Sequence, residues 1–480
     1  MTTGDIVSLD ALSLSQAIQT RNVSCVEVMD AYLAQIERLN PKVNAIVARV
    51  DDDTLRMQAA ERDAQLSRGE SLGPLHGFPQ APKDILPVAG MVTTKGSPIY
   101  AGQVSAADAV VFERMRRAGA IFIGRTNSPE FGLGGHTYNP VYGTTRNAFD
   151  QSRSAGGSSG GAAVSVALRM LPFADGSDMM GSLRTPAAFN NVFGFRSSPG
   201  WVPYAPADDV FFQQFSVAGP MARTVPELGL LFSIQAGFDA RAPLSRRSDR
   251  PTDFANALAR DMRGSRVGWL GDLNGRLAME AGLMEVYESA LSHFRTAGCT
   301  VEHAQIDFDW DRLWNAWLDL RSFTFAGNNA PLYRDDSKRA LLKPEAVWEI
   351  ERGLKLSGED VFRAVRDRSA FYQAINALFD QFDFLVMPAA QVFPFDASLD
   401  WPHAIGERTM DTYHRWMETV VPATMASLPA LSAPAGFGLG GLPAGLQIIG
   451  PTQKDLAVLQ LGLAYQHASG YAAKNSPLLG

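Results

Sequence analysis

Residues 154–162 read Ser154-Ala-Gly-Gly-Ser-Ser-Gly-Gly-Ala162, and residues 176–187 read Gly176-Ser-Asp-Met-Met-Gly-Ser-Leu-Arg-Thr-Pro-Ala187. Each stretch sets a serine, Ser158 or Ser182, among small residues. A third stretch upstream, Gly77-Phe-Pro-Gln-Ala-Pro-Lys-Asp84, carries Lys83. A serine hydroxyl is a weak nucleophile until a base removes its proton. Together the three stretches suggest a serine hydrolase in which either a histidine or Lys83 is that base.

The sequence around these stretches shows the alternating pattern of an α/β fold. From Leu75 to about residue 200, short apolar segments such as Ile121–Arg125 alternate with helical stretches such as Ala107–Ala118 and Gly160–Arg169. Glycine and proline are dense between them. This alternation predicts a mixed α/β fold with a mostly buried sheet sandwiched by helices.

The flanking regions predict further elements of both kinds. Residues 8–39 are typical of two amphipathic helices, and Ser24 with Glu27 forms a capping-box pattern at the start of the second. Residues 308–380 are mostly helical, and strands are expected near Phe384–Met387 and Ala430–Ala435. No repeat or low-complexity linker divides the chain. We expect one domain over 1–480 with 308–380 as a helical elaboration, and a division near residue 240 is the alternative.

Composition narrows the class of protein. The chain has 480 residues, of which 46% are hydrophobic and 19% charged, and its net charge is -7. This acidic balance argues against a nucleic-acid partner, because phosphate binding needs clustered Lys and Arg. The N-terminus lacks a signal-peptide pattern, and no apolar run is long enough to span a membrane. We expect a cytoplasmic protein whose two cysteines, Cys25 and Cys299, are free thiols.

Two other kinds of site find little support. The loop Gly156–Gly161 lacks the Lys-Ser/Thr of a phosphate-binding P-loop. No histidine pair has metal-ligand spacing, so a metal is not expected. The chain contains seven histidines: His76, His136, His293, His303, His403, His414 and His467.

A histidine-dependent interpretation competes with the lysine interpretation. Gly156–Gly160 matches G-x-S-x-G, the nucleophile elbow of α/β-hydrolases, which would make Ser158 the nucleophile. A downstream Asp or Glu and then a histidine would complete that triad, and five histidines follow Ser158 in the chain. The elbow does not account for Ser182 or Lys83, and a five-residue match in a Gly/Ser-rich stretch is a weak signal.

The three stretches together resemble the amidase signature family. The resemblance runs over about residues 75–205 and implies a mixed sheet between helices with a Lys–Ser–Ser triad. It implies Lys83 as base, Ser158 as bridging serine after a cis peptide bond, and Ser182 as nucleophile, with no metal or cofactor. The segments that carry it are Gly77–Asp84, Gly124–Phe131, Gly143–Asn147, Ser154–Ala162 and Gly181–Phe195.

The implied chemistry is physically sound. A lysine with a pKa of about 10.4 is protonated at neutral pH and useless as a base. Burial among apolar walls lowers a lysine pKa by up to ~3–5 units. Asp84 follows Lys83 directly, but in an extended segment its side chain points to the opposite face, so it need not cancel that shift.

The same mechanism needs backbone donors for the oxyanion. The N–H groups of Met179, Met180, Gly181 and Ser182 are expected to stabilise it. Most family members carry glycine where Met180 stands. Glycine takes a positive φ and directs its N–H freely, whereas a methionine there has ordinary dihedrals or is strained. Pro82, directly before Lys83, also departs from the family pattern.

Substrate preference is inferred from fewer signals. Gly132 lies in a segment that resembles a cleft-lining segment of the family, and Gln391 follows an expected strand end and could line the entrance. We expect hydrolysis of small-molecule amides and anilides through an acyl-enzyme, with a broad apolar or aromatic preference and with carbamate (urethane) and ester hydrolysis as side activities. The alternative within the family is an amidotransferase A-type subunit that handles glutamine in a complex. The oligomeric state stays open, with a homodimer as the candidate.

Overall fold

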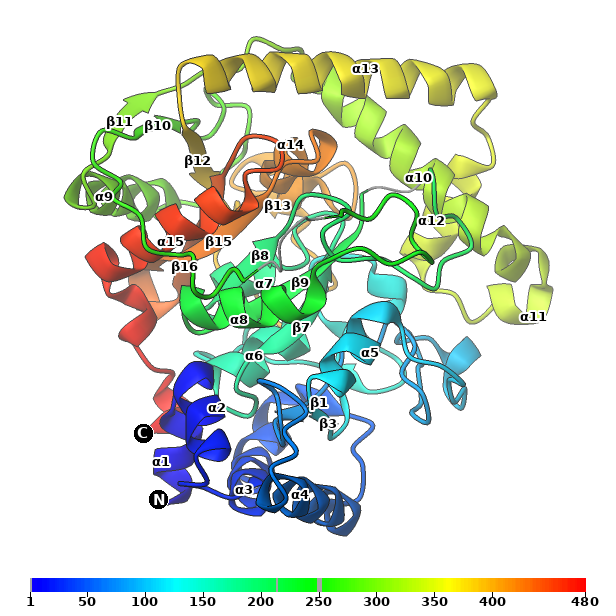
Figure 1. The fold of residues 1–480 in the computed structure, drawn as a ribbon. Helices are drawn as coiled ribbons and strands as arrows, with labels where there is room; N and C mark the ends of the chain where they lie inside the picture. The colour runs from blue at the N-terminus through cyan, green and yellow to red at the C-terminus, as the bar shows by residue number, and fades with distance from the viewer. Residues whose placement is uncertain (1, 213–214, 248–252) are drawn as a thin grey trace.

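A mixed eight-stranded sheet forms the centre of the molecule (Figure 1). The computed structural model describes residues 2–212, 215–247 and 253–480. The strand order is β11-β10-β12-β16-β15-β8-β9-β7. β10 runs parallel to both of its neighbours, and all other pairs are antiparallel. The strands are β7 (Ala174–Asp178), β8 (Phe193–Arg196), β9 (Val217–Ala222), β10 (Arg266–Trp269), β11 (Thr300–His303), β12 (Phe384–Pro388), β15 (Ala430–Phe437) and β16 (Pro443–Ile449).

The inner strands are buried on both faces. Every residue of β8, β9, β12 and β16 is buried, so both sides of the sheet are covered. Continuous apolar runs such as Phe384–Pro388 are typical of such strands. Helices α7 (Arg184–Phe189), α8 (Val225–Gln235), α9 (Leu283–Thr296) and α15 (Asp455–Ser469) pack against them. The predicted α/β class with a mixed, mostly buried sheet is confirmed.

Two groups of helices lie at opposite ends of the molecule (Figure 1). The first is N-terminal, and the capping box of Ser24 with Glu27 is present as predicted. The second forms the helical region expected over 308–380. The first group is α1 (Thr3–Ser8), α2 (Ala11–Gln19), α3 (Cys25–Val43) and α4 (Asp52–Ser67), and the second is α10 (Trp310–Arg334), α11 (Asp336–Arg339), α12 (Pro344–Gly353) and α13 (Gly358–Ala377).

Several details differ from the sequence-based expectations. The helix expected over Ala107–Ala118 is α5 (Val110–Arg117), and α6 covers Gly160–Ala167. The central sheet takes strands from both sides of residue 240, where a division was the alternative. Within the described ranges, no helix combines the length and apolar character needed to cross a membrane. Both cysteines are buried and free.

Candidate active site

Lys83 is buried beside three serine hydroxyls. It follows β2 (Pro79–Gln80), which pairs in parallel with β3 (Ile121–Phe122), and its side chain is only 2% exposed. Its Nζ donates to the Oγ atoms of Ser158 at 2.8 Å, Ser159 at 2.9 Å and Ser177 at 3.0 Å. A lysine held this way has exchanged its water shell for hydroxyl groups alone.

Burial lowers the pKa of Lys83, so its ammonium group loses a proton more easily than that of an exposed lysine. Desolvation lowers its pKa to about 7, while the negative charges of Asp175 and Asp178 act in the opposite direction. Burial also raises the pKa of Asp175 to about 6, which weakens that opposition. Asp84 binds Thr94 and lies 3.7 Å from Arg125, so it is directed away from Lys83 as expected.

Ser158 reaches Lys83 from the loop before α6. The peptide bond between Gly157 and Ser158 is cis, as the family resemblance implies. The chain here needs glycine, because a Cβ on Gly157 would lie 2.9 Å from the carbonyl carbon of Gly135. This close packing of two loops holds Ser158 against the lysine.

Ser182 lies in the turn between β7 and α7. Gly181 takes the positive φ of this turn (+78°), and Met180 does not, so the methionine in the place of the usual glycine has an ordinary backbone conformation. The Ser182 carbonyl accepts a hydrogen bond from the Ser159 N–H at 3.2 Å. The turn that carries Ser182 is therefore tied to the loop that carries Ser158.

Asp178 holds the Ser182 turn in shape. Its carboxylate accepts hydrogen bonds from the N–H groups of Gly181 and Leu183 and from the guanidinium of Arg184 through two nitrogens. Arg196 lies 3.3 Å from the same carboxylate. Burial opposes ionisation, but the two arginines hold the pKa of Asp178 well below its usual value. The carboxylate is thus a fixed anion that organises the turn.

Replacing Asp178 by alanine is expected to destabilise the fold strongly. The change would leave Arg184 and Arg196 buried without their counter-ion, and breaking a buried ion pair costs about 3–5 kcal/mol. Urea unfolding would measure the loss. Asp261→Ala, which removes an exposed partner of Arg263, is the matched control and should barely move the midpoint. A similar unfolding midpoint for both variants would contradict the role of Asp178 in holding the Ser182 turn.

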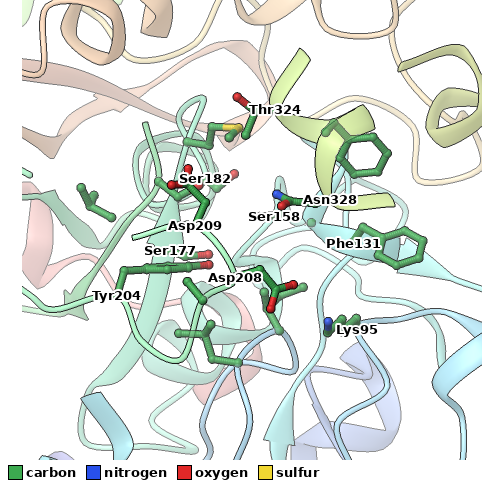
Figure 2. Close-up of a pocket in the computed structure, with 18 of the residues that line it drawn as sticks. Lys95, Phe131, Ser158, Ser177, Ser182, Tyr204, Asp208, Asp209, Thr324 and Asn328 are labelled. Carbon is green, nitrogen blue, oxygen red and sulfur yellow. The ribbon is translucent and has the colours of Figure 1, made fainter. Parts of the chain in front are cut away.

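A cavity of about 690 Å³ opens in front of the serines. Ser158, Ser177 and Ser182 line it (Figure 2), and Lys83 is not among its lining residues. The lysine therefore lies behind the hydroxyls that face the cavity. Much of the remaining wall is apolar or aromatic and includes Ile85, Phe131, Leu133, Met180, Tyr204 and Phe325.

The structure brings most of the predicted substrate-binding residues to this cavity. Gly132 lines it, and a Cβ there would lie 3.5 Å from the Ser158 Oγ. Met179 and Met180 line it as well. Within the described residues, no hydrogen bond uses the N–H group of Met179, Met180 or Ser182 as donor. These three N–H groups are therefore available to an oxyanion.

Gly181 and Gln391 are corrections to the expected site. The Gly181 N–H donates to Asp178 at 3.0 Å, so it serves the turn and not an oxyanion. Gln391 is buried, donates to the Ala278 carbonyl at 3.0 Å and accepts from the Thr419 N–H at 3.0 Å. The Gln391 amide makes its hydrogen bonds inside the protein, and the residue does not line the cavity.

Sequence reasoning missed three partners of Lys83. Ser177 and Asp175 alternate along β7, so both side chains face the lysine: Ser177 binds Nζ, and Asp175 accepts the Lys83 backbone N–H at 3.2 Å. Period-two alternation in a strand could have indicated this pair. Ser159 was hidden in the run of serines and glycines, where no pattern separates one hydroxyl from its neighbour.

The histidines do not contact the serines of the site. All seven lie in the described part of the chain, and none of their hydrogen bonds there reaches Ser158 or Ser182. His136 binds Ser154 and the Ala397 carbonyl, and burial lowers its pKa to about 4. His414 lines the cavity, and neither of its ring nitrogens has a hydrogen-bond partner among the described residues.

A buried lysine behind cavity-lining serines, on a mixed sheet covered by helices, points to the serine hydrolases as a class. The model of the Amidase family matches residues 27–459. The chain is 33% identical to an acylamidase of Rhodococcus erythropolis over 99% of this chain and 98% of that protein. It is also 33% identical to the A-type subunit of glutamyl-tRNA(Gln) amidotransferase from Ralstonia nicotianae, over 96% of this chain and 97% of that one.

The solved structures give the same answer. A bacterial aryl acylamidase of the amidase signature enzymes matches with a TM-score of 0.91 and 29% identity, over 98% of both chains. The chain belongs to the amidase signature family, and it is an enzyme that hydrolyses amide bonds. The resemblance found in the sequence is confirmed.

Proposed function

We propose that the protein hydrolyses small apolar or aromatic amides and anilides through an acyl-enzyme on Ser182, with Lys83 as base and Ser158 as relay. The observation that carries the proposal is the 2.8 Å contact between Lys83 Nζ and Ser158 Oγ, at a buried lysine whose pKa is about 7. A neutral amine in this position is a base of suitable strength near neutral pH.

The hydrogen bonds favour Ser158 as the hydroxyl that passes the proton. A neutral amine has two N–H donors and one lone pair, so one of its three hydroxyl neighbours must donate to it. Ser159 donates its own hydrogen to the Ser177 carbonyl at 3.3 Å. Ser158 and Ser177 both line the cavity with Ser182, and of these two Ser158 has the shorter contact with Lys83 Nζ, 2.8 Å against 3.0 Å. A proton from Ser182 would therefore reach Lys83 through Ser158.

The reaction would then run in two halves. Ser182 attacks the carbonyl carbon as its proton moves through Ser158 to Lys83, and the N–H groups of Met179, Met180 and Ser182 stabilise the oxyanion. Lys83 then returns the proton through Ser158 to the leaving nitrogen, and the amine departs. Water then attacks the acyl-enzyme by the same route and releases the acid, leaving Ser182 and Lys83 as they began.

The activity should rise with pH through a midpoint near 7, because only the neutral form of Lys83 can accept a proton. Measuring kcat/KM on an anilide from about pH 5 to about pH 9 would show a rise to a plateau. Asp175→Asn should move the midpoint to lower pH, since the Asp175 charge raises the pKa of Lys83. A flat profile, or an unmoved midpoint, would contradict Lys83 as the titrating base.

The cavity wall supports an apolar acyl or amine group. Phe131, Tyr204 and Phe325 offer aromatic surface beside the serines, and such surface binds flat rings well. The names of the matched acylamidase and aryl acylamidase agree with this preference. Carbamates and esters share the carbonyl and the tetrahedral intermediate of amides, so we propose both as side activities.

Two alternatives stay open to test. An amidotransferase role is favoured by the match to the A-type subunit of glutamyl-tRNA(Gln) amidotransferase. It would require glutamine as substrate and a stable partner protein. A histidine-dependent hydrolase centred on Ser158 would require a histidine within reach of that serine. The hydrogen bond from Lys83 Nζ to Ser158 Oγ supports the lysine interpretation instead.

A hydrolysis panel tests the proposal. Anilides, aliphatic amides, aryl carbamates and glutamine should be offered to the purified chain alone. We expect anilides to give the highest kcat/KM, carbamates lower values, and glutamine little or no turnover. Preferred release of ammonia from glutamine, or copurification with a stable partner, would instead favour the amidotransferase role.

Charge and cysteine content bear on the partners and the location of the protein. The acidic chain offers no reason to expect a nucleic acid, so its partner would be the small-molecule substrate. We propose a cytoplasmic enzyme on the basis of the two free cysteines. A homodimer stays a prediction that light scattering would test.

A further inference from the structure

Arg321 presents an underused donor to the active-site cavity. It lies on α10, lines the cavity and is 5% exposed. Its Nε donates to Glu349 and its Nη2 to the Tyr413 hydroxyl at 2.8 Å. Among the residues that the structure describes, its Nη1 donates only to the sulfur of Met179, at 3.3 Å. A thioether is a weak acceptor, so this N–H group would be better satisfied by an oxygen.

His414 lies next to it with two unused ring nitrogens. The side chain is fully buried and lines the same cavity, and neither nitrogen has a hydrogen-bond partner among the described residues. Its ring stacks on Tyr413 at 4.4 Å between centroids. Burial, and then the charge of Arg321, hold its pKa well below the usual value. The ring is therefore neutral and offers one donor and one acceptor.

The charges around this pair are already balanced. Glu349 neutralises Arg321, Asp319 pairs with Arg352, and Glu418 pairs with Arg415. A charged ligand would upset this balance, whereas a neutral oxygen would satisfy the open donors without adding charge. The open groups therefore fit an uncharged hydrogen-bond acceptor.

We propose that Arg321 and His414 form a subsite that donates hydrogen bonds to a second, uncharged carbonyl oxygen of the substrate. Met179 connects this subsite to the reaction, since its sulfur contacts Arg321 and its N–H group belongs to the turn before Ser182. The subsite would select amides that carry a further ketone, amide or ester carbonyl beyond the scissile bond. It rests on the proposed function and names the substrate class of the same cavity.

Substitutions at Met179 test the subsite without removing a buried charge. In Met179→Gln the side-chain oxygen is a strong acceptor that would occupy Arg321 Nη1. Met179→Leu is the matched control, because it is similar in size and has no acceptor. His414→Phe is a second test variant, which keeps the aromatic ring and removes both nitrogens.

Matched substrates isolate the second carbonyl. In one series, pentananilide is compared with its 3-oxo and 4-oxo analogues; in the other, the acetanilide of 3-ethylaniline is compared with that of 3-acetylaniline. The measurement is the ratio of kcat/KM for the oxo compound to that for its parent. Comparing this ratio between variants cancels the electronic difference between the two substrates.

We expect the ratio in at least one series to fall about tenfold from wild type to Met179→Gln, the loss of one hydrogen bond to a charged donor. It should hold or rise in Met179→Leu and fall in His414→Phe. Equal ratios in wild type, Met179→Gln and His414→Phe in both series would overturn the subsite alone. Failure of wild type to hydrolyse both parent anilides would overturn the proposed function, and the subsite with it.

Discussion

Ser182→Ala is expected to lower kcat on anilides by about 10⁴-fold or more, because the variant has no nucleophile to form the acyl-enzyme. The side chain is small and only 8% exposed, and no hydrogen bond of its hydroxyl supports the described fold. The variant should therefore unfold at the same temperature as wild type, so that a loss of activity reports chemistry.

Covalent labelling locates the nucleophile directly. A fluorophosphonate should modify wild type once, and peptide mapping by mass spectrometry should place the adduct on Ser182. Ser182→Ala should not be labelled, and Ser158→Ala should be labelled more slowly, since it lacks the relay. An adduct on Ser158 would point instead to the nucleophile elbow of a histidine-dependent hydrolase.

Lys83→Met is expected to lower kcat by about 10³-fold or more, since a positioned base contributes about 10²–10⁴-fold and the three serines lose the group that orders them. Lys83→Arg keeps a positive charge and donors but cannot give up its proton near neutral pH. It should be as inactive as Lys83→Met.

Comparing Lys83→Met with Lys83→Arg shows whether Lys83 acts as a base or only as a positive charge. Steady-state kinetics on an anilide, with circular dichroism to check folding, would provide it. If Lys83→Arg kept most of the activity, the positive charge of Lys83 would matter and its basicity would not. The expected pH profile of each variant also lacks the midpoint near 7 that belongs to Lys83.

Much of the candidate site could be predicted because its main residues lie in short sequence segments that can be recognised one by one. Lys83, Ser158 and Ser182 each sit in a short segment of distinctive composition. The structure brings the two serines to one cavity, with Lys83 bound to Ser158 behind its wall. Gln391 was misplaced because a strand end has two sides, and here its amide turns inward to Thr419 and Ala278. Sequence position alone does not fix that choice.

The wall of the cavity could not be predicted in the same way. Arg321 and His414 come from segments far from the serines in the sequence, and the fold brings both to the cavity, where Arg321 on α10 contacts Met179. Strands β8 and β9 were also missed, since Phe193–Arg196 is short and Val217–Ala222 contains glycine and proline. Their pairing depends on long-range contacts with β7 and β15.

The buried amine of Lys83 also makes folding release a proton. An unfolded lysine keeps its proton up to a pH near 10.5, whereas the folded one loses it near 7. Between these values the unfolded chain binds more protons, so the free energy of unfolding rises with pH across that window and is lowest at and below neutral pH. The deficit amounts to roughly 4–5 kcal/mol at about 1.36 kcal/mol per pKa unit. The enzyme therefore sacrifices conformational stability at neutral pH to keep its base, and an alkaline buffer should preserve it best.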